Sequence, residues 1–261
     1  MPTVAEIAAE ATESTDSERL RVLADHRSKS VRVAVAENAA TDDVTVELLL
    51  RDPVELVRLA GATNLAGRPA LQAVVAHSDE KWMRAILAHT FARDDDRGLP
   101  YDVQILLSED DFWETRQRIA ETTAYAEIFE QLLLDADARV RGRCAANPRI
   151  TLEQMERLVN DRSWIVRASA AGSGCRYPDD GQLLRLASDR SAGVRWAVVF
   201  RPDRPRAALE LIAEDTDADN RDHARRALRD EHAIMSEQVI EWAREERRRA
   251  DRIAPFIGAP R

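Results

Sequence analysis

The residues that most often do chemistry in proteins are few in this chain and are not grouped. The five histidines never stand four residues apart, and no HExxH or CxxC motif is present, so the common zinc-binding patterns are missing. Cys144 falls at a position expected in the core, and Cys175 lies in a turn with no histidine nearby in sequence to activate it. We therefore expect no metal, no cofactor and no nucleophilic cysteine.

The carboxylates and lysines give no better candidate for catalysis. Asp and Glu together number 47, but none stands in the kind of apolar stretch that makes a general acid. Lys29 and Lys81 are the only lysines, and neither has the apolar surroundings of a Schiff-base lysine. The acidic run Asp94–Asp96 lacks calcium-loop spacing and is interpreted as a solvated loop. The sequence therefore predicts a protein that is not an enzyme.

Arginine and aspartate, in contrast, recur at a nearly fixed spacing. The column of arginines is Arg32, Arg58, Arg84, Arg116, Arg141, Arg167, Arg195 and Arg221. Six residues before most of them stands an aspartate: Asp52, Asp110, Asp135, Asp161, Asp189 or Asp215. The gap between successive arginines is 25 to 32 residues. Such a period is typical of stacked repeats, whose units cannot bury their apolar faces alone. We interpret the two columns as structural ion pairs within or between repeats at the edge of the core, rather than as a basic groove.

The residues around each arginine predict two short helices per repeat. Counting the arginine as zero, positions −1, +3 and +4 share one helix face and are mostly apolar, with six alanines at +4 where another backbone must approach closely. Asparagine at +6, as in Asn38, Asn64 and Asn147, is expected to end this first helix in a left-handed turn; Arg201 is the exception. A leucine-rich second helix follows, and the next aspartate is expected to cap the helix after it.

The segments Val140–Pro148 and Leu158–Asp161 carry a family resemblance. They resemble the repeat of the leucine-rich repeat variant, and the Asp-to-Arg interval resembles that of HEAT-like repeats. The resemblance extends over about residues 26–230 and implies an all-α fold, a right-handed α-solenoid of about seven to eight two-helix repeats with capping helices at both ends. A founding variant-type protein has an N-terminal cysteine cluster for an iron–sulfur centre. No such cluster exists here, so that cofactor is not carried over.

The domain organisation follows from the repeats. We expect one solenoid domain over residues 1–261, with an N-terminal cap at 1–25, repeats at 26–230, a capping helix at 231–254 and a tail at 255–261. An insertion at residues 92–100 precedes the least regular repeat, that of Arg116. The triplet Arg247–Arg249 is interpreted as a solvated helix end.

Composition limits the partners and the compartment. A formal net charge of −9 argues against general binding of nucleic acid, because that binding depends on neutralised phosphates. No run of eighteen apolar residues and no signal peptide is recognised, so we expect no membrane span and no export. Two cysteines fit a reducing cytoplasm, and the use of arginine in place of lysine indicates a GC-rich, bacterial source.

The aromatic residues offer the main signal for a binding surface. Four of the five tryptophans stand near the start of a first helix: Trp82, Trp113, Trp164 and Trp196. Packing between neighbouring repeats is the favoured interpretation, and a partly exposed aromatic row is the alternative. Further apolar residues are expected to face away from the core, namely Leu56, Ile86, Ile165 and Phe200.

These observations favour an interaction scaffold that binds a peptide or protein along its superhelical groove without catalysis. The candidate partner-binding residues are Trp82, Ile86, Trp196 and Phe200, with Arg118 and Arg143 supplying charge. The alternative is a nucleic-acid-binding protein or enzyme similar to HEAT-like alkylpurine DNA glycosylases. A weaker third hypothesis is a lyase or chaperone for a chromophore, a role also found among HEAT-like proteins.

Overall fold

The computed structural model describes residues 2–92, 98–174 and 178–230, and within these ranges every regular element is a helix. The predicted all-α repeat fold is confirmed. Several predictions fall outside the described residues: the acidic run Asp94–Asp96, Cys175, the capping helix at 231–254 with Arg247–Arg249, and the tail at 255–261.

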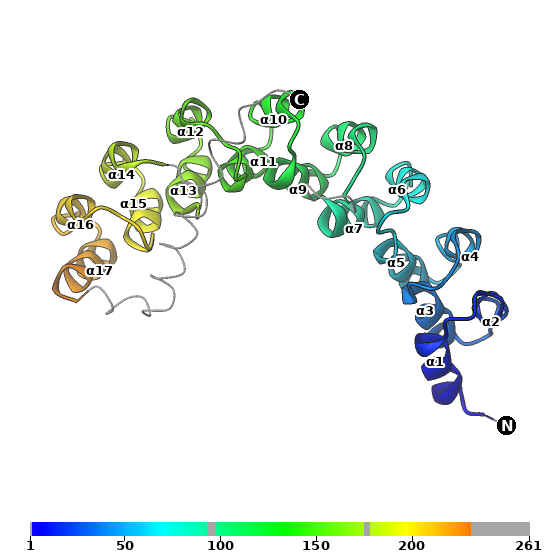
Figure 1. Cartoon of the computed structure of the whole chain (residues 1–261). Coiled ribbons are helices and arrows are strands. Elements are labelled where there is room, and N and C mark those ends of the chain that lie inside the picture. The colour runs from blue at the N-terminus through cyan, green and yellow to red at the C-terminus, as the bar shows by residue number, and fades with distance from the viewer. Residues whose placement is uncertain (1, 93–97, 175–177, 231–261) are drawn as a thin grey trace. The chain divides into compact units, whose positions relative to one another are not determined.

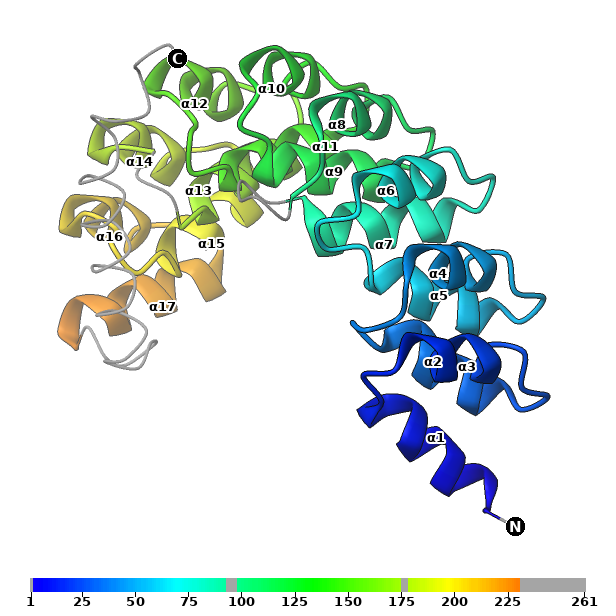
Figure 2. The ribbon, with the colours of Figure 1, turned by 45° about the vertical axis from the view of Figure 1, so that its right-hand side comes forward.

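Contacts divide the chain into two compact units, Met1–Ile119 and Ala120–Arg261, which we call unit 1 and unit 2. The boundary falls inside a helix, α9. Each unit is built from helix pairs in two layers, as the labels in Figures 1 and 2 show.

The first helices of the repeats form one layer of each unit. They are α3 (Lys29–Glu37), α5 (Glu55–Thr63), α7 (Lys81–Phe91), α9 (Trp113–Thr122), α11 (Ala138–Arg143) continued by a 3₁₀ turn (Cys144–Ala146), α13 (Trp164–Gly172), α15 (Ala192–Val199) and α17 (Ala218–Arg229). The second helices form the other layer: α4 (Asp43–Leu49), α6 (Pro69–Ala76), α8 (Tyr101–Ser108), α10 (Ala126–Leu132), α12 (Leu152–Val159), α14 (Asp180–Ala187) and α16 (Arg206–Ile212). Ahead of them, α1 (Val4–Glu13) and α2 (Ser17–Leu23) make the pair expected at the N-terminus.

Local sequence signals set where several second helices begin. Thr151 and Gln154 form a capping box at the start of α12, and Asp179 and Gln182 do the same for α14. Pro69 occupies the first position of α6, where its missing N–H costs nothing.

The aspartate column does not cap the first helices, so that prediction was wrong in detail. Asp161 lies two residues before Ser163, the N-cap of α13, and its Oδ1 accepts the backbone N–H of Ser163 at 2.7 Å. This bond closes a turn ahead of the helix, and both carboxylate oxygens of Asp161 also accept hydrogen bonds from Arg141, Oδ2 at 2.8 Å and Oδ1 at 3.0 Å.

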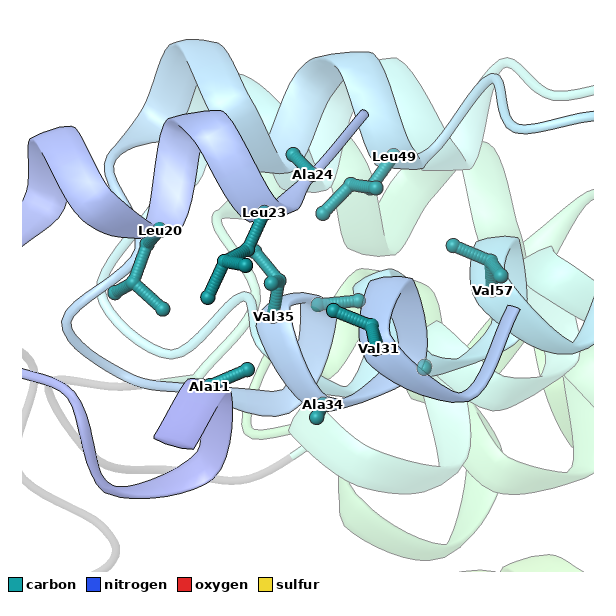
Figure 3. Close-up of a cluster of buried hydrophobic side chains, with 11 residues drawn as sticks. Ala11, Leu20, Leu23, Ala24, Val31, Ala34, Val35, Leu49 and Val57 are labelled. Carbon is teal, nitrogen blue, oxygen red and sulfur yellow. The ribbon is translucent and has the colours of Figure 1, made fainter. Parts of the chain in front are cut away.

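The core lies between the two layers. In unit 1 it includes Ala11 of α1, Leu20 and Leu23 of α2, and Val31 and Val35 of α3 (Figure 3), all at most 4% exposed. The alanines at +4 are at most 1% exposed: Ala36, Ala62, Ala88, Ala120, Ala145 and Ala171. Consecutive first helices contact each other, as α3 does α5 in unit 1 and α13 does α15 in unit 2. The expected close approach of backbones therefore occurs in this layer.

Gly142 shows how close that approach is. A Cβ atom on Gly142 of α11 would lie 2.8 Å from the Oγ of Ser169 in α13. A side chain at this position would require the Ser169 hydroxyl to rotate away, and the Ser169 Cβ atom, at 3.2 Å, would leave little room beyond that.

Candidate functional site

A column arginine such as Arg167 joins three segments of the chain. Arg167 Nε and Nη2 donate to the two carboxylate oxygens of Asp189 in the next repeat, at 2.6 and 2.9 Å. Its Nη1 donates to the backbone carbonyl of Asp161, six residues earlier in its own repeat, at 2.8 Å. Asp189 also accepts the N–H of Ser191 at 2.8 Å. We call such an arginine–carboxylate pair between consecutive repeats a rung.

The rungs share one direction. Within the units, the arginine of one repeat binds the aspartate of the following repeat: Arg32–Asp52, Arg84–Asp110, Arg141–Asp161, Arg167–Asp189 and Arg195–Asp215. The bond to the carbonyl six residues earlier occurs in all eight repeats, including those of Arg116 and Arg221. The column arginines therefore have a structural role, because their side chains hold together segments of the repeats.

Burial and charge oppose each other at a rung. Burial raises the pKa of Asp215, but hydrogen bonds from Arg195 and from the N–H of Asp217 outweigh it and lower that pKa to about 2. The carboxylate therefore stays ionised at neutral pH and cannot serve as a general acid there. The pKa of Asp189 is lowered in the same way by Arg167 and the N–H of Ser191, against the effect of burial.

One rung of unit 1 is displaced. Arg58 binds Glu80, with Nε 2.8 Å from Oε1, while Arg58 Nη1 donates to the Asp52 carbonyl at 2.7 Å. Ser78 stands where other repeats have aspartate, and its Oγ accepts the N–H of Glu80 at 3.2 Å. In the sequence the nearest aspartate, Asp79, stands five rather than six residues before Arg84, but the carboxylate of this rung comes from Glu80.

The asparagines at +6 form a second ladder, which the sequence did not predict. Asn147 Nδ2 donates to the carbonyls of Ala120 and Thr123 at 3.0 Å each, at the end of the preceding first helix. Asn38 and Asn64 make equivalent bonds in unit 1. The predicted left-handed turn was wrong: Asn147 has φ −71° and ψ 123°, because an extended backbone aims its amide at those carbonyls.

Arg201 takes the place of asparagine in this second ladder. Its Nη1 donates to the carbonyls of Ala171 and Ser173, at the end of α13. The side chain is 1% exposed, and its charge is balanced by Asp203, with Nε 2.6 Å from Oδ1. The apparent exception in the repeat therefore performs the same function with a longer donor.

Unit 1 carries one aromatic cluster on its first helices. Trp82 at the start of α7 is 49% exposed and meets Phe112 of the next repeat edge-to-face, with ring centroids 5.0 Å apart. Lys81 Nζ lies 5.5 Å from the Trp82 centroid and 4.9 Å from that of Phe112. Ile86 is half-buried. Phe112 was not singled out in the sequence because it precedes the helix.

Unit 2 carries the second cluster. The Trp196 ring of α15 lies 4.4 Å from Phe200 and 5.0 Å from His223 of α17, centroid to centroid. Trp196 is 40% exposed and Phe200 is half-buried. Trp164, 53% exposed, packs on Gly193 of the next repeat, since a Cβ there would lie 3.0 Å from its ring. The tryptophans therefore pack between repeats and are also partly exposed.

The two candidate arginines differ from free surface cations. Arg143 of α11 pairs with Glu121 of α9, with Nε 2.9 Å from Oε2. Arg118 is half-buried on α9. A partner that binds Arg143 has to compete with Glu121.

Other candidates for chemistry are explained by the structure. Cys144 is fully buried, and burial raises the pKa of its thiol, so the reactive thiolate is disfavoured. Among the described residues, no three His, Cys, Asp or Glu side chains are grouped to hold a metal. Nor does any helix in those ranges have the length and apolar character to cross a membrane.

The paired helices and their rungs can be compared with solved structures. One match is titled "a leucine-rich repeat variant with a novel repetitive protein structural motif". It covers 77% of this chain and 77% of its own, at 21% identity and a TM-score of 0.55. The described helices therefore have a fold similar to that of this leucine-rich repeat variant. No family model and no curated protein matches the chain, and a likeness at this identity concerns fold alone.

Proposed function

We propose that this leucine-rich repeat variant fold is a non-catalytic interaction scaffold, which binds a peptide or protein through exposed side chains of its first helices. The observation that carries the proposal is the exposure of Trp82, Trp164 and Trp196, at 49%, 53% and 40%. Large aromatic side chains left open on a rigid layer are a common basis of protein–protein recognition.

Packing between repeats makes these side chains suitable anchors. Trp196 is held against Phe200 and His223, so its ring is restrained before a partner arrives. A restrained anchor loses less conformational entropy on binding than a free one. Trp82 is restrained by Phe112 in the same way.

The proposal is tested with peptides selected from a random display library against the full chain. Trp82→Ala and Trp196→Ala should each weaken a selected peptide about tenfold or more, while the melting temperature falls by only a few degrees. Val44→Ala is the matched control, because Val44 is 71% exposed on the second-helix layer.

Two outcomes would contradict the proposal. If Trp196→Ala reduces stability and binding equally, the residue belongs to the core. If no selected peptide depends on Trp82, Trp164 or Trp196, the first-helix layer is not the binding surface.

A further inference from the structure

Two neighbouring hollows lie along the loops that connect the repeats of unit 2. The first has a volume of about 410 Å³, and its charged lining is Asp135, Arg141, Arg157, Asp161 and Arg162. The second, of about 390 Å³, is lined by Asp161, Arg162, Arg167, Arg185, Asp189 and Arg190. Asp161 and Arg162 belong to both, so the hollows are adjacent.

The two hollows repeat the same design. Counted from the column arginine that follows, both are lined at −10 (Arg157 and Arg185), at −6 (Asp161 and Asp189) and at −5 (Arg162 and Arg190). They are therefore the same site displaced by one repeat. A ligand that matches both must itself repeat along the stacking direction.

The charges of the hollows are only partly balanced. The aspartates are bound by column arginines, as in the rungs Arg141–Asp161 and Arg167–Asp189. Arg157 and Arg185 pair with Glu130 and Glu156.

Arg162 and Arg190 are the two charged lining residues not yet accounted for. Both are exposed, and among the described residues neither guanidinium takes part in a hydrogen bond or a close ion pair; the charge of each only helps to lower the pKa of the aspartate before it, Asp161 or Asp189. Each hollow thus keeps an open cation in a chain of net charge −9.

Unit 1 lacks this pattern. Its residues at −5 in the same register are Arg27, Pro53, Asp79 and Asp111, and those at −10 are Val22, Leu48, Val74 and Leu106, so no repeat of unit 1 has arginine at both positions. At these positions of unit 1 an anionic ligand would meet a single cation, Arg27, and the two carboxylates of Asp79 and Asp111. The basic hollows are thus a local feature of unit 2, not a consequence of the repeat.

We propose that the hollows bind an extended acidic peptide segment, with one carboxylate at Arg162 and the next at Arg190. Packed helices lie about 8–10 Å apart and an extended chain rises about 3.3 Å per residue, so the matching acidic residues are about three positions apart. Guanidinium groups bind carboxylates by two parallel hydrogen bonds. Two open cations suit a short acidic segment better than nucleic acid, which requires many neutralised phosphates.

This inference goes beyond the proposed function, because it uses loop residues and not the aromatic clusters. The full chain is titrated into a fluorescein-labelled peptide whose glutamates are three positions apart, and anisotropy is measured at low salt. A peptide of the same composition with adjacent glutamates tests the spacing, and labelled duplex DNA tests the competing class of ligand.

The expected result is specific to the two arginines. Arg162→Gln and Arg190→Gln should each weaken the spaced peptide about tenfold. Arg206→Gln is the matched control, because Arg206 is an arginine of unit 2 whose side chain is 72% exposed outside the hollows. Trp196→Ala should also leave this affinity unchanged, which separates failure of this proposal from failure of the aromatic surface.

Three outcomes would overturn the proposal: equal affinity of the double variant and the wild type, equal affinity for the two peptides, or tighter, Arg162-dependent binding of DNA. Melting curves of each variant verify that the rungs are intact.

Discussion

The rung Arg167–Asp189 of unit 2 and the rung Arg58–Glu80 of unit 1 both join consecutive repeats, but they use different residues to do so. Asp189 both closes the turn before its helix and binds the arginine of the preceding repeat, and its side chain is 10% exposed. In unit 1 the turn is closed by Ser78 and the ion pair is made by Glu80, whose side chain is 40% exposed. Because the two tasks are divided between two residues in unit 1, the carboxylate that pairs with the arginine, that of Glu80, is more exposed to solvent than that of Asp189.

That difference should appear in stability. Removing one partner of a buried pair leaves an unpaired charge without water, whereas an exposed pair is screened and contributes little. The two rungs therefore provide a comparison within one chain, and three measurements can break it or sharpen it.

The largest effect is expected for Asp189→Ala. It leaves Arg167 buried without its carboxylate and removes the acceptor for the N–H of Ser191, so the free energy of unfolding should fall by about 3–5 kcal/mol. Urea unfolding followed by circular dichroism measures the loss. Glu214→Ala is the control, since Glu214 is 81% exposed in its pair with Arg225 and should cost less than about 1 kcal/mol. A similar loss for both variants would show that the rungs are not the main connection between repeats.

Acid should weaken the buried rungs over a defined range. Burial raises the pKa of Asp215, but Arg195 and backbone donors lower it to about 2, against an ordinary value of 3.8. Because the pKa is lower in the folded state, this stabilisation is complete above about pH 4 and is lost as the pH falls toward 2, at about 1.4 kcal/mol per pKa unit. Urea unfolding between pH 5 and 2 should show the gap between wild type and Asp215→Asn narrowing on acidification. A constant gap would mean that Asp215 is not held ionised by its rung.

The smallest effect is expected for Glu80→Ala. Solvent screens this pair, so the unfolding free energy should fall by only about 0.2–1 kcal/mol. Adding Ser78→Asp to that variant restores the carboxylate six residues before Arg84 and should recover the loss or exceed it. If Glu80→Ala costs as much as Asp189→Ala, exposure does not determine the strength of a rung.

The sequence was most informative about residues that recur at the same position of every repeat and have the same role in each. The arginine column, the alanines at +4 and the helix pairs all followed from spacing, because helix periodicity fixes which positions share a face. It was less informative where the partner comes from another repeat. Nothing local shows that Asn147 donates to Ala120 and Thr123, or that Arg201 can replace asparagine, since those carbonyls lie more than twenty residues away.

The aromatic surface was predicted only in part. The positions of Trp82 and Trp196 were visible in the sequence, but their partners Phe112 and His223 stand in the next repeat, outside the apolar pattern. The basic hollows were missed because Arg162 and Arg190 follow the aspartates immediately and were counted with the general surplus of charge. Arg162 and Arg190 stand out only once it is known which other arginines already pair with carboxylates. That information comes from the three-dimensional structure.

The one-way orientation of the rungs has a consequence for how such a chain can change in length. Within each unit, a repeat joined on both sides by rungs presents a guanidinium on its C-terminal side and a carboxylate on its N-terminal side, as Arg167 and Asp161 do within one repeat. Duplicating or deleting a whole repeat joins a cation to an anion at the new junction, whereas a change of half a repeat does not. The common direction of the rungs therefore favours the gain or loss of complete repeats. Related chains can then differ in the number of repeats while each new junction still pairs an arginine with a carboxylate.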